Sequence, residues 1–154
     1  MTTIEIKLAS LLSDVKVKSH MNTARIKDPD DRYLVRAAEE NEAETVQCLQ
    51  EAWRSMLSLC RRFLDPTDDD MGDDVLMRTP ETTRTLTFDI TERRTSNIGD
   101  PLAQAIHSFL VAGTLRRFYT SVAMADLVAA YAAQEQSAAN EITNLLYRKQ
   151  EPTY

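Results

Sequence analysis

DPLAQAIHSFLVAGTLRRFY, residues 100–119, is the most informative segment of the chain. Its Asp100-Pro101 pair indicates the start of a helix, because a capping side chain is followed by proline in the first turn. The apolar side chains that follow cover a broad surface of this helix: Leu102, Ile106, Phe109, Leu110, Leu115, Phe118, Tyr119 and Val122. A helix with so wide an apolar surface is predicted to lie near the middle of the domain.

A second long helix is predicted after this one. The residues between Thr120 and Ala123 are β-branched or carry hydroxyls, which weakens a helix, so we expect a kink or a short turn there. An apolar seam with alternating gaps of four and three residues then continues, and no Gly or Pro interrupts it before Pro152. Its members are Met124, Val128, Tyr131, Glu135, Ala138, Ile142 and Leu145. The spacing predicts one long, straight helix from Ala125 to Lys149.

A long loop and one strand are predicted before residue 100. Residues 65–83 contain six Asp, one Gly and two Pro, a composition typical of a loop. Residues 85–91 alternate apolar and polar side chains, which indicates a half-buried strand. A lone strand is marginally stable, so this one needs a partner. The sequence leaves three partners open: the segment Ile4–Leu8, the residues around Val75–Met77, and a strand of a neighbouring subunit.

The N-terminal part is predicted to hold a short strand and two helices. Apolar and polar side chains alternate from Ile4, and at Leu8 the apolar residues change to helical spacing. The helix predicted from this spacing ends near His20. Residues 25–32 are interpreted as a solvated linker, and Asp65-Pro66 ends the next helix because proline disfavours helical geometry before it. The seam of this next helix has gaps of three and four residues and comprises Val46, Leu49, Trp53, Met56, Cys60 and Phe63.

The composition indicates one mainly α domain, a small helical bundle with two long helices and a short strand or hairpin in a central excursion. A length of 154 residues suits a single core, and three Gly with five Pro are too few for a many-stranded sandwich. We divide the domain into an N-terminal strand and helix (1–24), a linker and long helix (25–64), an acidic loop and strand (65–99), two helices (100–150) and a tail (151–154). The start MTTIEIKLAS lacks the pattern of an export signal, so folding in a cytoplasm is expected.

No catalytic, metal or cofactor site is predicted. The net charge of −6 disfavours a surface that grips nucleic acid. Gly72 does not fit the calcium loop of an EF-hand, because the glutamate position falls on Arg78. His107 is interpreted as a partly exposed histidine rather than a catalytic base, and Cys48 and Cys60 as small apolar core residues. The acidic loop is interpreted as a solvated surface whose negative charge would repel phosphate backbones, which suits the lining of a passage for DNA or contact with a neighbouring subunit. Its acidic residues are Asp68, Asp69, Asp70, Asp73 and Asp74.

Paired arginines stand out in this acidic chain. Arginine favours interfaces and the pairing of carboxylates, so a subunit interface is one interpretation. The alternative is that these side chains pair with acidic residues of their own chain or lie in water. The residues proposed for the interface are Arg93, Arg94, Arg116 and Arg117.

The order of elements resembles the small helical head-tail connector (adaptor) proteins of tailed bacteriophages and prophages. The resemblance depends on the helix that contains PLAQAIHSFLV and ends in an aromatic-rich turn; the residues that carry it are Pro101, Leu102, Ala105, Ile106, Val111, Phe118 and Tyr119. It covers the second half of the chain well and the first half loosely.

The resemblance implies a non-enzymatic virion protein without a cofactor. In that family, copies of the chain, commonly twelve, form a ring under the portal protein, extend the DNA channel and contact the next neck or tail protein. DNA passes by without sequence-specific binding, and no membrane is involved. The C-terminal segment often docks onto the portal, which points to Leu145, Leu146, Tyr147, Arg148, Lys149 and Tyr154.

Two other classes remain open. The chain could be a cytoplasmic helical regulatory module that forms a homodimer through its long seams. A metal-dependent helical-bundle enzyme is a weaker alternative, because such enzymes carry paired Glu-x-x-His motifs on inward faces and this sequence has none.

Overall fold

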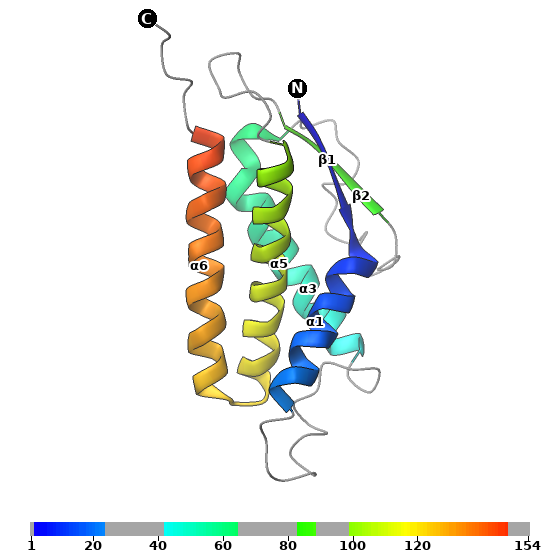
Figure 1. Cartoon of the computed structure of the whole chain (residues 1–154), viewed down its shortest axis with the longest axis vertical. Coiled ribbons are helices and arrows are strands. Elements are labelled where there is room, and N and C mark those ends of the chain that lie inside the picture. Colours follow the sequence, from blue (N-terminus) through cyan, green and yellow to red (C-terminus); the bar gives the residue numbers. More distant parts are fainter. Residues whose placement is uncertain (1, 24–41, 65–82, 89–98, 148–154) are drawn as a thin grey trace, which may run out of the picture.

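The computed structural model describes residues 2–23, 42–64, 83–88 and 99–147, and these form a mainly helical domain. Four helices and a two-stranded antiparallel sheet make up the described part, which confirms the predicted fold class (Figure 1). In chain order the elements are β1 (Thr2–Lys7), α1 (Leu8–Thr23), α3 (Glu42–Cys60), the short 3₁₀ helix η2 (Arg61–Phe63), β2 (Thr83–Phe88), α5 (Gly99–Ser121) and α6 (Ala125–Tyr147). None of the described helices combines the length and the apolar character that crossing a membrane requires.

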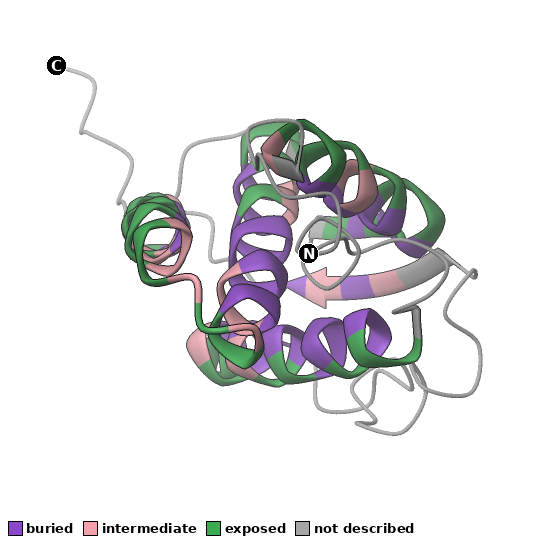
Figure 2. Cartoon of the chain, turned by 90° about the horizontal axis from the view of Figure 1, so that it is seen from below, coloured by how far each residue is buried: buried purple, intermediate pink, exposed green. Residues whose placement is uncertain are grey.

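Helix α5 is the centre of the bundle. Seen along the bundle, α1 and α3 lie on opposite sides of α5, the sheet fills the space between those two helices, and α6 runs along the outside (Figure 2). Most of α5 is consequently buried, and the predicted core side chains lie inside: Leu102, Ile106, Phe109, Leu110, Leu115, Phe118 and Tyr119. The prediction that this helix occupies the middle of the domain is confirmed.

A tight turn joins α5 to α6, where the sequence predicts a kink or a short turn. Ala123 has a φ of 58°, the left-handed conformation that commonly ends a helix. The N–H of Met124 donates to the carbonyl of Tyr119 at 3.0 Å, and the N–H of Ala123 donates to that of Thr120 at 3.2 Å. These two bonds satisfy carbonyls at the end of α5, so the chain reverses there and α6 packs back along α5 (Figure 1).

The strand pairs with the N-terminal segment, one of the three partners left open by the sequence. β1 and β2 are antiparallel, and Ile4 lies opposite Leu86. Both side chains are buried, and an isolated bridge joins Leu64 to Phe88 on the other side of β2. The described strand covers 83–88 and so includes residues 83 and 84 in addition to the predicted start at Thr85; residues 89–91 lie outside the described residues.

The predicted seam of α3 is fully buried, whereas the predicted seam of α6 is buried only in part. All six seam residues from Val46 to Phe63 are buried, but the last turn tightens into the 3₁₀ helix η2. In α6 the buried positions are Tyr131, Ala138, Ile142 and Leu146, so Leu146 takes the place predicted for Leu145. The described part of α6 ends at Tyr147 rather than at Lys149.

Both cysteines are free and buried, as interpreted from the sequence. Burial raises the pKa of the Cys48 thiol to about 11, with Glu51 and Glu44 adding to the effect, and raises that of Cys60 to about 12. A thiol whose pKa is higher in the folded than in the unfolded state stabilises the fold below the unfolded pKa. That contribution is lost as the pH rises from about 9 towards 12.

We therefore expect native thiols to react slowly with a disulfide reagent at pH 8. Because the thiolate is the reactive form, Cys48 should react about 100-fold more slowly in the native protein than in urea, and Cys60 more slowly still. The absorbance of the released thiol measures both rates. Native thiols that react as fast as unfolded ones would show that these side chains are open to solvent.

Candidate functional site

A cluster of charged side chains joins α3, α5 and α6 around the predicted pair Arg116 and Arg117. Arg116 donates from Nε to Glu135 Oε2 at 2.7 Å and from Nη2 to Glu135 Oε1 at 3.4 Å. Arg117 Nη1 lies 3.8 Å from the same Oε2, and its Nε lies 3.6 Å from Glu51 Oε2 on α3. Arg117 also donates from Nη2 to Ser55 Oγ at 2.9 Å. One glutamate of α6 is thus shared by two arginines of α5.

The absence of a side chain at Gly113 makes room for this cluster. A Cβ there would lie 3.0 Å from Arg117 Nη1, 3.2 Å from Glu135 Oε2 and 3.3 Å from Ala52 Cβ. Arg117 Nη1 also donates to the carbonyl of Gly113 at 3.0 Å. Burial and the neighbouring Arg116 lower the pKa of Arg117, whereas Glu135 and Glu51 raise it. The glutamates therefore offset the cost of holding a guanidinium between three helices.

Both arginines of this pair are consequently engaged within their own chain, which is the alternative that the sequence left open. The side chain of Arg117 is only 16% exposed, and that of Glu135 15%. Arg93 and Arg94, the other residues proposed for a subunit interface, lie outside the described residues. A role for these two in an interface stays a prediction.

The residues proposed to bind a portal differ in how accessible they are. Leu146 is fully buried, so its side chain supports the core of the bundle rather than lying open to a partner. Leu145 is partly buried, whereas Tyr147 is exposed and its ring packs edge-on against Phe63 at 4.8 Å. Arg148, Lys149 and Tyr154 lie outside the described residues, as do Asp68, Asp69, Asp70, Asp73 and Asp74 of the acidic loop.

Helix α6 presents an uncharged outer surface. Its other side packs on α5, and the outward side is exposed along the bundle (Figure 2). Between Asp126 and Glu141 the only charged residue of α6 is Glu135, which faces the arginines of α5. The exposed residues in this interval, called the α6 outer face below, are Ala129, Ala130, Ala133, Gln134, Gln136, Ser137 and Asn140.

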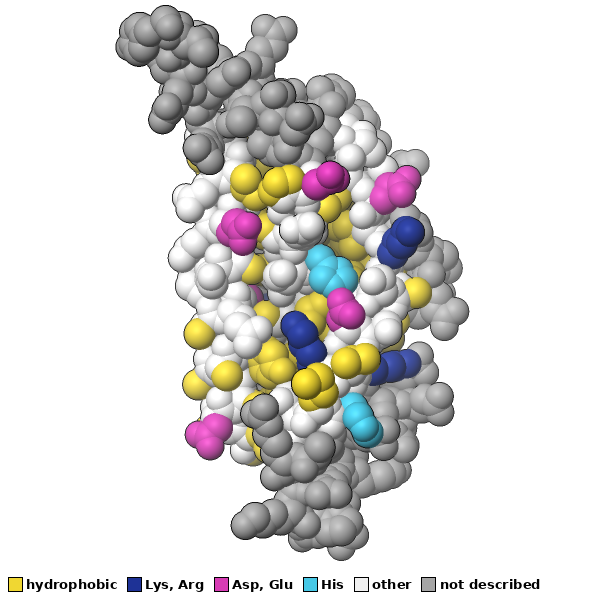
Figure 3. Space-filling model, viewed as in Figure 1, with side chains coloured by type: hydrophobic (Ala, Val, Ile, Leu, Met, Phe, Trp, Pro, Cys, Tyr) yellow, Lys and Arg dark blue, Asp and Glu magenta, His cyan; other side chains and the backbone are white. Residues whose placement is uncertain are grey.

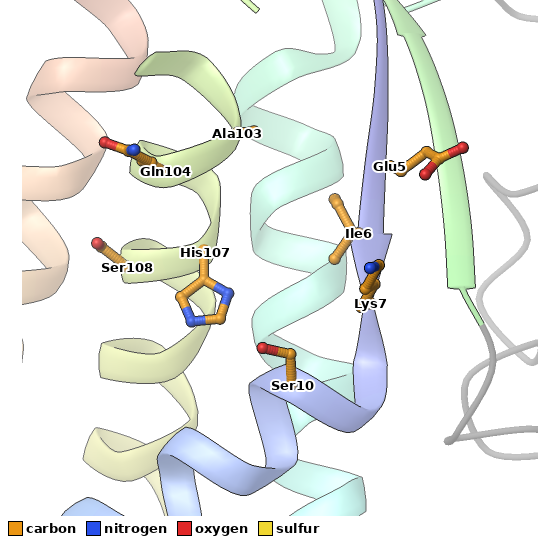
Figure 4. Close-up of a pocket in the computed structure, with 8 residues that line it drawn as sticks. All are labelled: Glu5, Ile6, Lys7, Ser10, Ala103, Gln104, His107 and Ser108. Atoms are coloured by element: carbon orange, nitrogen blue, oxygen red, sulfur yellow. The ribbon is translucent and has the colours of Figure 1, made fainter. Parts of the chain in front are cut away.

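A groove of about 590 Å³ lies between α5, β1 and the start of α1 (Figure 4). Its α5 wall carries Gln104, His107 and Ser108, and Ser10 of α1 closes one end. The volume is within the range of small-ligand sites. The face that includes this groove carries scattered charges of both signs and no large cluster of one sign (Figure 3).

His107 and Asp14 form the main polar contact beside this groove. His107 Nε2 lies 2.5 Å from Asp14 Oδ2, and the two side chains are 35% and 49% exposed. The interpretation of His107 as a partly exposed histidine is confirmed. The sequence contained no signal for its partner, because Asp14 lies 93 residues away on a different helix. The contact ties α1 to α5 below the groove.

Among the described residues, no group of three or more His, Cys, Asp or Glu side chains is placed to hold a metal ion. Comparisons of the chain with models of known protein families, with curated proteins and with solved structures find no match.

Proposed function

We propose that the protein is a non-enzymatic structural component of a tailed phage or prophage, a head-tail connector that assembles as a ring under the portal protein. In this role it extends the DNA channel towards the tail and contacts the neck or tail proteins below. The observation that carries the proposal is the α6 outer face, an exposed helix surface that runs along the bundle. Between Asp126 and Glu141 this surface carries no charged side chain.

The chemistry of this face suits contact with another copy of the chain. Charged side chains are depleted from the centres of protein interfaces, because each must lose its water on association. Alanine loses no side-chain freedom when it is covered, and its small size lets a second helix approach closely. The chain as a whole carries a net charge of −6, so an uncharged surface is also where two copies repel one another least.

The end of α6 supports the second part of the proposal. Tyr147 is anchored on Phe63 at the end of α6, and the sequence continues directly into Arg148 and Lys149. A basic and aromatic segment at the end of a rigid helix suits insertion into a larger partner. Because Leu146 belongs to the core, the docking segment proposed here begins after Tyr147.

Removal of residues 148–154 is expected to abolish docking to the portal protein encoded in the same genome. The truncation leaves α6 and its buried positions intact, so the helical signal in circular dichroism should stay unchanged. Co-purification of the chain with a tagged portal measures docking, and the expected loss is more than about tenfold in recovered chain.

A second variant replaces residues 148–154 by a Gly/Ser segment of equal length, which keeps the length of the segment and removes its side-chain chemistry. It should fail to dock as the truncation does, because the chemistry of the segment is needed and not only its length. Full docking of both variants would contradict the proposed role of this segment. A chain that forms a closed dimer and ignores the portal would instead support the regulatory module.

A further inference from the structure

The groove beside His107 borders an edge of β1 with which no described strand pairs. In the described part of the chain β1 is hydrogen-bonded to one strand only, β2. Three consecutive residues of β1, Glu5, Ile6 and Lys7, line the groove. Successive side chains of a strand point to opposite faces, so a cavity that touches three in a row borders the edge of the strand rather than one face. Unpaired backbone N–H and C=O groups at such an edge are a template for another strand.

The opposite wall is a polar face of α5. Ala103, Gln104, His107 and Ser108 fall within two turns of the helix and line the groove together. In the close-up His107 extends towards β1 and Ile6 points back towards α5, whereas the side chains of Gln104 and Ser108 extend towards α6 (Figure 4). The result is a slot between a strand edge and a helix, with apolar side chains from Ile6 and Ala103 and hydrogen-bonding groups along one wall.

His107 is oriented for a ligand in this slot. Asp14 engages Nε2, so Nδ1 is the ring nitrogen left for the groove. When Nε2 carries the proton that Asp14 accepts, Nδ1 of the neutral ring accepts a hydrogen bond from an N–H or O–H group. A main-chain amide or a hydroxyl side chain of a bound peptide supplies such a donor.

One basic side chain, that of Lys7, lines the slot. Lys7 lines the end where β1 passes into α1, and the first turn of α1 contains no acidic residue. The N–H groups at the start of α1 add a partial positive charge at this end. The carboxylate of Glu5 points away from the slot, over β2 (Figure 4). A carboxylate is therefore the complementary group at the Lys7 end.

We propose that this groove binds an extended peptide segment of a partner protein, which adds a third strand to the edge of β1 and places a carboxylate at Lys7. The strand edge of β1 supplies main-chain hydrogen bonds, and the polar wall of α5 selects the side chains. The carboxylate is either the C-terminus of the peptide or an acidic side chain. This binding site goes beyond the proposed connector role and does not depend on ring formation.

A displayed library of random decapeptides with free C-termini, selected on the immobilised full-length chain, is the probe. Selection should enrich peptides that alternate β-branched or apolar residues with polar ones and carry a carboxylate near one end. The enriched peptide is then synthesised with a free carboxylate and with a terminal amide. A loss of binding in the amide form assigns the carboxylate to the C-terminus, and equal binding assigns it to the acidic side chain.

Two pairs of variants locate the site. Ser10→Trp places a large ring at the α1 end of the slot, and Ser58→Trp places the same ring on the exposed side of α3 (Figure 4). Lys7→Glu reverses the charge at the end of the slot, and Lys18→Glu makes the same reversal at an exposed position of α1. The first member of each pair should weaken binding at least about tenfold, and the control should leave it unchanged.

Amide NMR signals provide a readout that does not depend on the variants. The bound peptide should shift and protect the signals of β1 and of residues 103–108, with little change on α3. The proposal is overturned by a selection that enriches no peptide, by equal binding to Ser10→Trp and Ser58→Trp, or by signal changes confined to another surface. If peptides without any carboxylate bind equally well, the assignment of a carboxylate to the Lys7 end of the groove is wrong.

Discussion

Replacement of Glu135 by alanine is expected to lower the free energy of unfolding by about 2–3 kcal/mol, because it leaves two arginines of α5 without their shared carboxylate. Glu135 bonds Arg116 through both oxygens and lies 3.8 Å from Arg117. Arg117 is held between three helices and cannot simply turn into water. Urea unfolding followed by circular dichroism measures the change.

The matched control for this prediction is Glu141→Ala, a substitution of the same type on an exposed position of the same helix. It is expected to change stability by less than about 0.5 kcal/mol. Glu135→Gln, which retains the shape and one acceptor oxygen, should fall between the two. Equal effects of the alanine substitutions at 135 and 141 would show that the charged cluster contributes nothing measurable.

Ala133→Glu on the α6 outer face is expected to disrupt assembly of the chain almost completely. The substitution introduces a carboxylate at the centre of the uncharged interval, and association would have to bury this charge in every copy. Alanine-to-glutamate changes on an exposed helix surface cost little helix propensity, so the monomer should stay folded. Sedimentation velocity should show the assembled fraction falling by more than about tenfold.

Ser58→Glu adds the same charge to an exposed position of α3 and serves as the control. Assembly should be unchanged in this variant, because α3 lies on another side of α5 from the α6 outer face (Figure 2). If Ala133→Glu assembles as the wild type does, copies do not meet through this face. Another surface would then have to hold the proposed ring together.

Most of the helices could be predicted because the apolar spacing of each one matches its own buried face. Trp53 and Ile106 lie in seams that the sequence shows directly, and both are fully buried. The apolar spacing of α6 also includes Glu135, and the sequence alone does not explain a charged residue at that position. The structure supplies the reason, since the turn at Ala123 folds α6 back so that Glu135 meets the arginines of α5.

Features that depend on distant segments could not be chosen from the sequence. The sequence alone does not identify the strand that pairs with β2, because Ile4–Leu8 is one of three segments that could do so. The groove was not predicted either, since its walls come from β1, α1 and α5 and no local spacing connects Lys7 with His107. Side chains that are polar and scattered along the chain become a site only when the fold brings them to one cavity.

Native mass spectrometry of a mixture of this chain and the portal protein proposed as its partner tests the central claim most directly. The claim that copies of the chain stack against one another under the portal predicts a complex that contains many copies of the 17.5 kDa chain, arranged as a ring. A single mass near 17.5 kDa, in the presence and in the absence of the portal, would contradict it.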